Sequence, residues 1–253
     1  MLNSAWTFLD SPVPLAFAHR GVHLDVPENS RMSFSAAVQL GYRYIETDVR
    51  CTADNKVIVF HDARARRITG LNTRISSLTF SELQSAAKAS GVGDIPLLLD
   101  ILEEFPGLRF NIDVKDWRAA ELVPKIVRQN AACDRVCINS FSAARIRCVR
   151  SHLTDTVCTG APVSEFLHFL IRPNNYAKAS QPAVLQLPLS TKGIPVVTRK
   201  LIDKAHKMGL PVHVWTLNDL PTIQQAIQLK VDGIMTDEPI LLKDELIRCD
   251  LWR

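Results

Sequence analysis

The sequence predicts an α/β protein built as a (β/α)8 TIM barrel, with a small insertion after the second strand. Two observations favour this fold class. Short runs of apolar and β-branched residues alternate along the chain with stretches of helical periodicity, and such alternation is typical of a parallel sheet covered by helices. The chain also has 253 residues, which is close to the length of about 250 that a one-domain barrel commonly uses. A doubly wound sheet is the competing fold.

Eight short apolar segments are expected to form the strands of the barrel. Each has the continuous apolar character of a strand that is buried on both faces of a parallel sheet. A further extended run at residues 57–60 lies inside the second unit, and the segment that follows it fits no simple β–α unit. We therefore expect a single domain over residues 1–253, with an insertion at roughly 62–107. The expected strands are residues 15–19, 43–49, 109–114, 135–139, 156–159, 183–187, 211–216 and 233–236.

Helical periodicity follows the strands in turn. In the helix expected at residues 30–41, Ser30 is a candidate N-cap and Gly41 a candidate C-terminal stop. Pro124 should kink or divide the helix expected at residues 118–130, because proline lacks the N–H that an interior helical turn uses. The remaining helices are expected at residues 142–152, 163–172, 198–209, 218–230 and 238–248.

Composition excludes several classes of protein. The net charge of +4 suits an anionic ligand, but it is too small and too dispersed for a nucleic-acid-binding protein. No apolar run reaches the length of about 18 residues that a membrane span needs, so no transmembrane segment is expected. The first residues lack the pattern of a signal peptide, and the six cysteines lack C-x-x-C spacing. We therefore expect a cytoplasmic protein with free, mostly buried thiols.

Polar residues collect where the expected strands end. Glu46 and Asp48 are two positions apart, so on one strand both carboxylates face the same way. Like charges side by side repel, and a bound cation would offset that repulsion. In a parallel barrel the carboxyl ends of the strands form the active site, so these end residues should converge there. The strand ends carry His19, Arg20, Glu46, Asp48, His61, Asp62, Asp113, Lys115, Trp215, Thr216, Thr236 and Asp237.

The residue types at these ends indicate a chemistry. Three carboxylates without a cysteine ligand favour a hard divalent cation, Mg²⁺ or Ca²⁺. Two histidines can exchange protons near neutral pH. Two further cations can hold an anion. Together these groups suit the cleavage of a phosphate ester.

The sequence resembles the glycerophosphodiester phosphodiesterase family. The matching segments occur in the family's order and at compatible spacing from about residue 15 to residue 240, and the ordered set is far more specific than any one fragment. They are "AHRG" (18–21), "PENS" (27–30), "IETDV" (45–49), "VIVFHD" (57–62), "RITG" (67–70), "NIDVK" (111–115), "VWTLND" (214–219) and "DGIMTDEP" (232–239).

The resemblance implies a divalent metal and the hydrolysis of glycerophosphodiesters to sn-glycerol 3-phosphate and an alcohol. It also implies a barrel with a small insertion after the "HD" segment. By matching position, the acid/base pair would be His19 and His61. The metal ligands would be Glu46, Asp48 and Asp113, and the phosphate contacts would be Arg20 and Lys115. Trp215 is expected to pack against the substrate.

Three departures from the family's pattern keep alternatives open. Asp113 stands where the family usually has Glu, which also fits a degenerate barrel that binds phosphodiesters without cleaving them. Leu97 and Leu99 replace polar residues of the family, so we expect a more apolar wall at the mouth of the site. Arg64, Arg66 and Arg67 follow the "HD" segment, where the family commonly has an acid. The leucines and the basic segment fit a lysophospholipase D-like enzyme, with peripheral contact to lipid.

Overall fold

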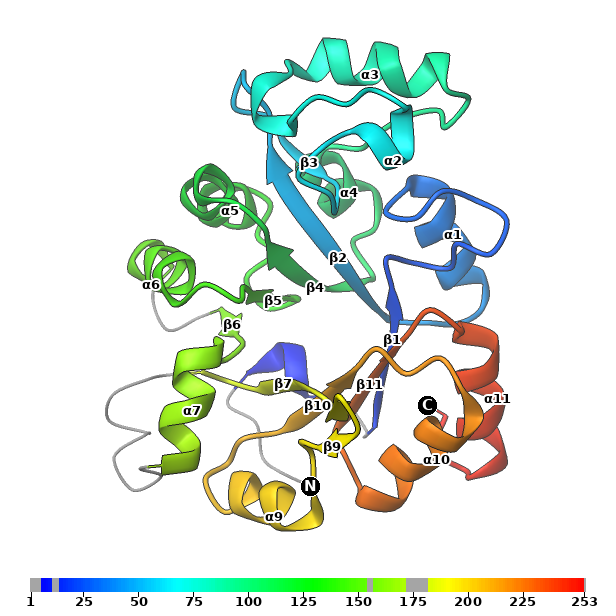
Figure 1. The fold of residues 1–253 in the computed structure, drawn as a ribbon, viewed down its shortest axis with the longest axis vertical. Coiled ribbons are helices and arrows are strands. Elements are labelled where there is room, and N and C mark those ends of the chain that lie inside the picture. The colour runs from blue at the N-terminus through cyan, green and yellow to red at the C-terminus, as the bar shows by residue number, and fades with distance from the viewer. Residues whose placement is uncertain (1–5, 11–13, 154–156, 172–181, 253) are drawn as a thin grey trace.

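Eight parallel strands form a closed ring in the computed structural model, which describes residues 6–10, 14–153, 157–171 and 182–252 (Figure 1). Around the ring the strands follow the order β6-β5-β4-β2-β1-β11-β10-β7. The two ends of this path meet at a parallel bridge between Gly160 and Val184, where the Ala161 N–H donates to the Val184 carbonyl at 3.0 Å. This closure confirms the predicted barrel, and the doubly wound alternative is wrong because that sheet has open edges.

The predicted strand positions are confirmed, with small shifts at their ends. The strand expected at residues 43–49 continues to Cys51, because β3 (Val57–Val59) pairs with its far end in antiparallel register. Thr156 of the strand expected at 156–159 lies outside the described residues. The barrel strands are β1 (Leu15–His19), β2 (Tyr44–Cys51), β4 (Arg109–Val114), β5 (Val136–Asn139), β6 (Cys158–Thr159), β7 (Leu185–Pro188), β10 (Val212–Trp215) and β11 (Gly233–Thr236).

Helices surround the ring of strands on its outer side (Figure 1). Ser30 caps the first of them in a capping box with Ser33, as predicted, and Gly41 follows its end with φ +85°. Arg172 of the helix expected at 163–172 lies outside the described residues. The helices around the barrel are α1 (Arg31–Gln39), α4 (Leu98–Glu104), α5 (Trp117–Gln129), α6 (Ala143–His152), α7 (Val163–Ile171), α9 (Arg199–His206), α10 (Leu220–Leu229) and α11 (Pro239–Arg248).

Helix α5 runs through Pro124 as one helix, rather than as two pieces. Proline cannot donate to the carbonyl four residues earlier, which is that of Ala120. The thiol of Cys148, on the neighbouring helix α6, lies 3.8 Å from this carbonyl oxygen and donates to it. A side chain from the next helix therefore partly replaces the missing backbone hydrogen bond.

The segment between β3 and β4 has a small apolar cluster of its own. This cluster lies under α2 (Arg66–Thr69), the 3-10 helix η2 (Ile75–Ser77) and α3 (Phe80–Ala89), and it includes Ile58, Phe60, Ile75 and Leu83. Helix α4 instead packs its buried residues into the core between the barrel and its helices. Within the range 62–107, α4 is thus the barrel helix that precedes β4, while α2 and α3 lie beyond the ring (Figure 1).

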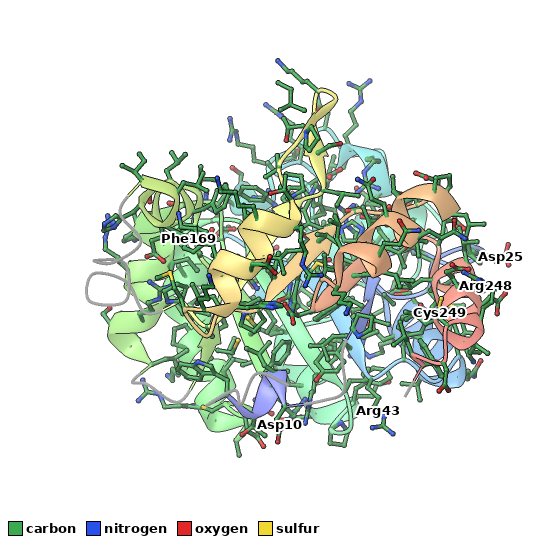
Figure 2. All side chains as sticks on the ribbon, turned by 90° about the horizontal axis from the view of Figure 1, so that it is seen from below. Asp10, Asp25, Arg43, Phe169, Arg248 and Cys249 are labelled. Atoms are coloured by element: carbon green, nitrogen blue, oxygen red, sulfur yellow. The ribbon has the colours of Figure 1, made fainter. Side chains whose placement is uncertain are left out.

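The two ends of the barrel differ. At the amino-terminal end, the 3-10 helix η1 (Thr7–Leu9) covers the opening of the barrel. Phe8 is buried there, and its carbonyl accepts from the Tyr44 hydroxyl at 2.8 Å. At the other end, a hairpin of β8 (Ser190–Thr191) and β9 (Ile194–Pro195) follows β7. Figure 2 shows this yellow hairpin projecting at the top, opposite Asp10 and Arg43. The amino-terminal end of the barrel is therefore covered by η1.

A buried polar layer lies inside the barrel. The Asn111 side-chain oxygen accepts from Gln186 Nε2 at 2.8 Å and from Asn139 Nδ2 at 2.7 Å. The ring of His213 is completely buried and lies across from Gly233 in the strand register. A Cβ at Gly233 would come within 2.6 Å of the imidazole Cδ2, so this position requires glycine. Burial lowers the pKa of His213 to about 3, and the imidazole is therefore neutral.

All six cysteines are free thiols, as predicted. None of the described helices has both the length and the apolar character that crossing a membrane requires.

Candidate active site

A cavity of about 540 Å³ opens at the carboxyl end of the strands. The barrel brings together there side chains that are up to 216 positions apart in the sequence, from His19 to Met235. All eight residues for which a role was expected line this cavity: His19, Arg20, Glu46, Asp48, His61, Asp113, Lys115 and Trp215.

Strand register explains how the three carboxylates meet. Asp48 on β2 pairs directly with Asp113 on β4, and Glu46 pairs with His19 on β1. Burial raises the pKa of Glu46 to about 8, and the nearby Asp48 charge adds to that rise. Burial also raises the pKa of Asp113. Oε2 of Glu46 and Oδ1 of Asp113 are buried and have no hydrogen-bond donor, which is costly for carboxylates.

Asp48 differs because two cations hold it in the charged form. Lys115 Nζ lies 2.8 Å from Asp48 Oδ1 and 2.6 Å from Asp113 Oδ2. Arg20 Nε lies 3.1 Å from Asp48 Oδ2. Burial alone would raise the pKa of Asp48, but Lys115 and Arg20 outweigh it and lower that pKa. The two residues expected to contact phosphate thus form ion pairs with the acidic cluster.

The "PENS" segment orients this cluster from the loop after β1. Asn29 Nδ2 donates to Asp48 Oδ2 at 3.1 Å, and the Asn29 side-chain oxygen accepts from the Thr47 hydroxyl at 2.7 Å. Both Arg20 and Asn29 have positive φ, at 59° and 54°. Their backbones are joined, because the Asn29 N–H donates to the Arg20 carbonyl at 2.9 Å. The loop is therefore fixed in a conformation that points Asn29 at β2.

Each of the two histidines is hydrogen-bonded to an aspartate through Nδ1. His19 Nδ1 lies 2.6 Å from Asp237 Oδ1, and its Nε2 lies 3.5 Å from Glu46 Oε2. Burial lowers the pKa of His19, but the charges of Glu46 and Asp237 outweigh burial and leave this pKa raised. His61 Nδ1 lies 2.7 Å from Asp62 Oδ1. An aspartate at Nδ1 fixes the ring and leaves Nε2 for proton exchange.

Sequence reasoning missed the partners that hold these groups. Asp237 was recognised at the end of the eighth strand, but its bond to His19 spans 218 positions. Arg67 was recognised as part of a basic segment, yet it binds Asp62 and Glu28. The contacts of His19 with Asp237 and of Arg67 with Glu28 span 218 and 39 positions, and contacts of this range leave no signal in local spacing. The "RITG" and "DEP" segments of the family pattern were the available pointers.

The expectation for the apolar wall was wrong in its location. Leu97 precedes α4 and packs on the apolar cluster under α2 and α3, and Leu99 lies on α4 with 37% of its surface exposed. Neither residue lines the cavity. The cavity does have an apolar wall, but α7 and the segments around it form that wall.

The carboxylates expected to bind a divalent cation fit that role in part. Among the described residues, no three His, Cys, Asp or Glu side chains are already gathered as a metal-binding cluster. Lys115 lies between Asp48 and Asp113 and balances their charge. The buried oxygens of Glu46 and Asp113 that lack donors are nevertheless hard ligands of the kind that Mg²⁺ and Ca²⁺ prefer.

Comparison with known proteins identifies the family. Residues 19–241 match the model of the glycerophosphoryl diester phosphodiesterase family. The chain is 36% identical to the probable glycerophosphodiester phosphodiesterase 2 of Mycobacterium tuberculosis, over 94% of this chain and 92% of that protein. It is 28% identical to lysophospholipase D GDPD1 of Rattus norvegicus, over 90% of this chain and 85% of that protein.

Solved structures described as glycerophosphoryl diester phosphodiesterases share the fold of this chain. A crystal structure of a putative glycerophosphoryl diester phosphodiesterase from Silicibacter pomeroyi superimposes with a TM-score of 0.81, at 21% identity, over 98% of this chain and 100% of that one. The family model matches residues 19–241, and this range includes both the histidine and the carboxylate segments. This chain therefore belongs to the glycerophosphoryl diester phosphodiesterase family.

Proposed function

We propose that this protein hydrolyses glycerophosphodiesters to sn-glycerol 3-phosphate and an alcohol, with Mg²⁺ or Ca²⁺ as cofactor. One observation carries the proposal. A single cavity holds two histidines, each bound to an aspartate through Nδ1, beside two buried carboxylate oxygens that lack donors. Two histidines able to exchange protons, next to buried acidic oxygens that lack hydrogen-bond donors, are a costly arrangement for a merely structural site.

The cation would be held by Glu46, Asp48 and Asp113. When bound, it supplies positive charge to the phosphoryl oxygens, which makes the phosphorus easier to attack. The orphaned oxygens of Glu46 and Asp113 support this ligand set. Asp113 is one methylene shorter than the Glu common in the family, and its register partner Asp48 keeps it at the cluster.

The remaining roles fall to the chain's own charged groups. Arg20 and Lys115 offset the negative charge that the phosphoryl group gains in the transition state. His19 takes the proton of the attacking oxygen, and His61 donates a proton to the alkoxide as its bond to phosphorus breaks. Asp237 and Asp62 keep the two rings oriented. Trp215, which lines the same cavity, packs against the substrate.

The test is a panel of cations and substrates with the purified protein. Glycerophosphocholine is supplied with Mg²⁺, Ca²⁺ or Mn²⁺, and the released sn-glycerol 3-phosphate is measured. Activity should disappear with a chelator and fall by about 10²- to 10⁴-fold in His19→Ala. The matched control is His152→Ala, which removes an exposed histidine on α6 and should leave the rate unchanged.

The degenerate barrel makes the opposite prediction. It requires that no cation supports turnover, while calorimetry still detects binding of glycerophosphocholine. That pair of results would replace the proposed function with phosphodiester binding alone. The lysophospholipase D alternative loses one of its two original supports, because Leu97 and Leu99 lie away from the cavity. The name of the rat relative keeps monoacyl lipids among the substrates to be tested.

A further inference from the structure

The cavity has two chemically different halves, and the proposed function uses only one. Its charged and histidine side chains all come from the part of the chain that ends at Lys115. Every residue that lines the cavity from position 139 onward is uncharged. The apolar part of that lining consists mainly of Phe141, Val163, Phe166, Leu167, Leu187 and Val196.

This apolar wall is exposed where it meets the mouth of the cavity. Phe141 is 61% exposed, Val163 51% and Leu167 50%. The acidic residue of α7 is not part of the wall, because Arg150 of α6 donates to Glu165 at 2.7 Å. Apolar side chains gathered at a mouth and left open to water mark a surface that binds something. The lime-green helix α7 and the yellow hairpin β8–β9 stand at the same end of the barrel (Figure 2).

We propose that this half of the cavity binds the acyl chain of a monoacyl glycerophosphodiester, a lysophospholipid. The inference rests on the proposed function, since it needs the phosphodiester to be bound beside Arg20 and Lys115. From there one substituent extends along the uncharged wall, because both halves belong to one cavity. A charged substituent would lose hydration there without finding a counter-ion. Each buried methylene instead strengthens binding by about fourfold.

The cavity is large enough for this substrate. Its volume of about 540 Å³ lies within the range of pockets that enclose small ligands. The reaction at phosphorus is the same for both substrates. The oxygen of water forms a bond to phosphorus, the bond to the headgroup alcohol breaks, and the hydrogens of the water end on the released alcohol and the phosphate product. A monoacyl glycerol phosphate and the free alcohol result.

The test compares hexanoyl-lysophosphatidylcholine, kept below its micelle concentration, with glycerophosphocholine. Choline release is measured for both, so the two substrates differ only in the acyl chain. The wild type should favour the acylated substrate by at least about tenfold in kcat/KM. Leu167→Gln and Val163→Asn should each lower this ratio by about fourfold or more. Both positions are half exposed, and thermal melts will confirm that the variants fold.

The matched control is Ile247→Gln on α11, which changes a 52% exposed apolar residue that does not line the cavity. It should leave the ratio of the two kcat/KM values unchanged. Turnover of glycerophosphocholine without any acyl preference would overturn the inference while the proposed function stands. An acyl preference that survives in both α7 variants would also overturn it, since the chain would then lie elsewhere.

If neither substrate is turned over, the proposed function fails. The affinities of the two ligands then test whether the acyl site exists. Calorimetry with the same two ligands then measures their affinities for the wild type and for Leu167→Gln. Tighter binding of the acylated ligand that is lost in Leu167→Gln supports the acyl site. Equal affinities overturn it.

Discussion

The guanidinium of Arg67 donates to both carboxylate oxygens of Asp62, from Nε at 2.7 Å and from Nη2 at 3.2 Å. It also donates to both oxygens of Glu28, at 2.9 and 2.7 Å. Asp62 binds His61, and Glu28 accepts from Arg20 at 3.0 Å. A single arginine on α2 therefore ties the loop that carries His61 to the loop that carries Arg20.

Arg67→Ala should lower kcat by about tenfold to a hundredfold. The reason is that His61 and Arg20 lose a shared support, and displacements of about 1 Å in a reacting group are costly. Arg67→Lys should recover only part of the rate, because an ammonium cannot bind two carboxylates bidentately. Steady-state kinetics with glycerophosphocholine measures both. The control is Arg64→Ala, whose guanidinium donates to the Asn72 carbonyl at 3.2 Å. Equal effects of the Arg64 and Arg67 changes would contradict this role.

Asp237→Asn should lower the pKa of His19. Burial acts to lower this pKa, while Glu46 and Asp237 raise it above the ordinary value of 6.5. Removing the Asp237 charge leaves burial with less opposition. Because the folded pKa is raised, protonated His19 contributes stability below pH 6.5, and that contribution is lost as the pH rises through the folded value.

An NMR titration of the His19 imidazole in the cation-free protein measures this pKa directly. Glu238→Gln is the matched control, since it removes an exposed acid next to Asp237 that makes no side-chain cap for α11. The control should leave the His19 titration almost unchanged. An unchanged midpoint in Asp237→Asn would contradict the assigned partner.

The sequence predicted those parts of the site that depend on strand ends. His19, Glu46, Asp48, Asp113 and Lys115 follow apolar runs, and a parallel barrel gathers the carboxyl ends of its strands at one face. This reasoning needs only the order of elements along the chain. The structure confirms that these side chains share one cavity.

The sequence could not predict what depends on side-chain partners between distant loops. The pair His19–Asp237 is formed only when β11 closes the ring beside β1. The apolar wall was misplaced for a related reason. Leu97 was judged by its position in the family pattern, whereas Leu167 and Val163 lie in a segment for which the sequence predicted only a helix. Only the packing of α7 beside the cavity makes them part of its lining.

Lys115→Met should destabilise the cation-free protein by about 3 kcal/mol. The Lys115 ammonium lies 2.8 Å from Asp48 and 2.6 Å from Asp113, and both carboxylates are buried. Removing one partner of a buried ionic group leaves the other charges uncompensated. A divalent cation should then stabilise the variant more than the wild type, because it replaces the missing positive charge.

Thermal melts with a chelator and with excess Mg²⁺ measure both effects. At a cation concentration about 100 times its Kd, binding adds about 2.7 kcal/mol to the free energy of unfolding. Lys125→Met is the control, since Lys125 is exposed on α5. If Tm falls equally in both variants, the ammonium does not stabilise the acidic cluster.

His213→Gln should remove part of the protein's sensitivity to acid. The imidazole of His213 is completely buried, and burial lowers its pKa to about 3 from the ordinary 6.5. The unfolded chain therefore binds a proton that the folded chain excludes. Stability that is present above pH 6.5 is lost as the pH falls, at about 1.36 kcal/mol per pH unit. Between pH 6.5 and pH 5 this amounts to about 2 kcal/mol.

Urea unfolding at pH 7 and pH 5 tests this for the wild type, His213→Gln and the exposed control His152→Gln. The wild type and the control should lose about 2 kcal/mol more than His213→Gln over this interval. Glutamine can still meet Gln186 on the neighbouring strand β7, where His213 Nδ1 now lies 3.5 Å from Gln186 Nε2. A buried neutral ring must take up a proton on unfolding, so the free energy of unfolding must depend on pH differently in His213→Gln. The same loss between pH 7 and pH 5 in all three proteins would mean that the interior admits the charged imidazole.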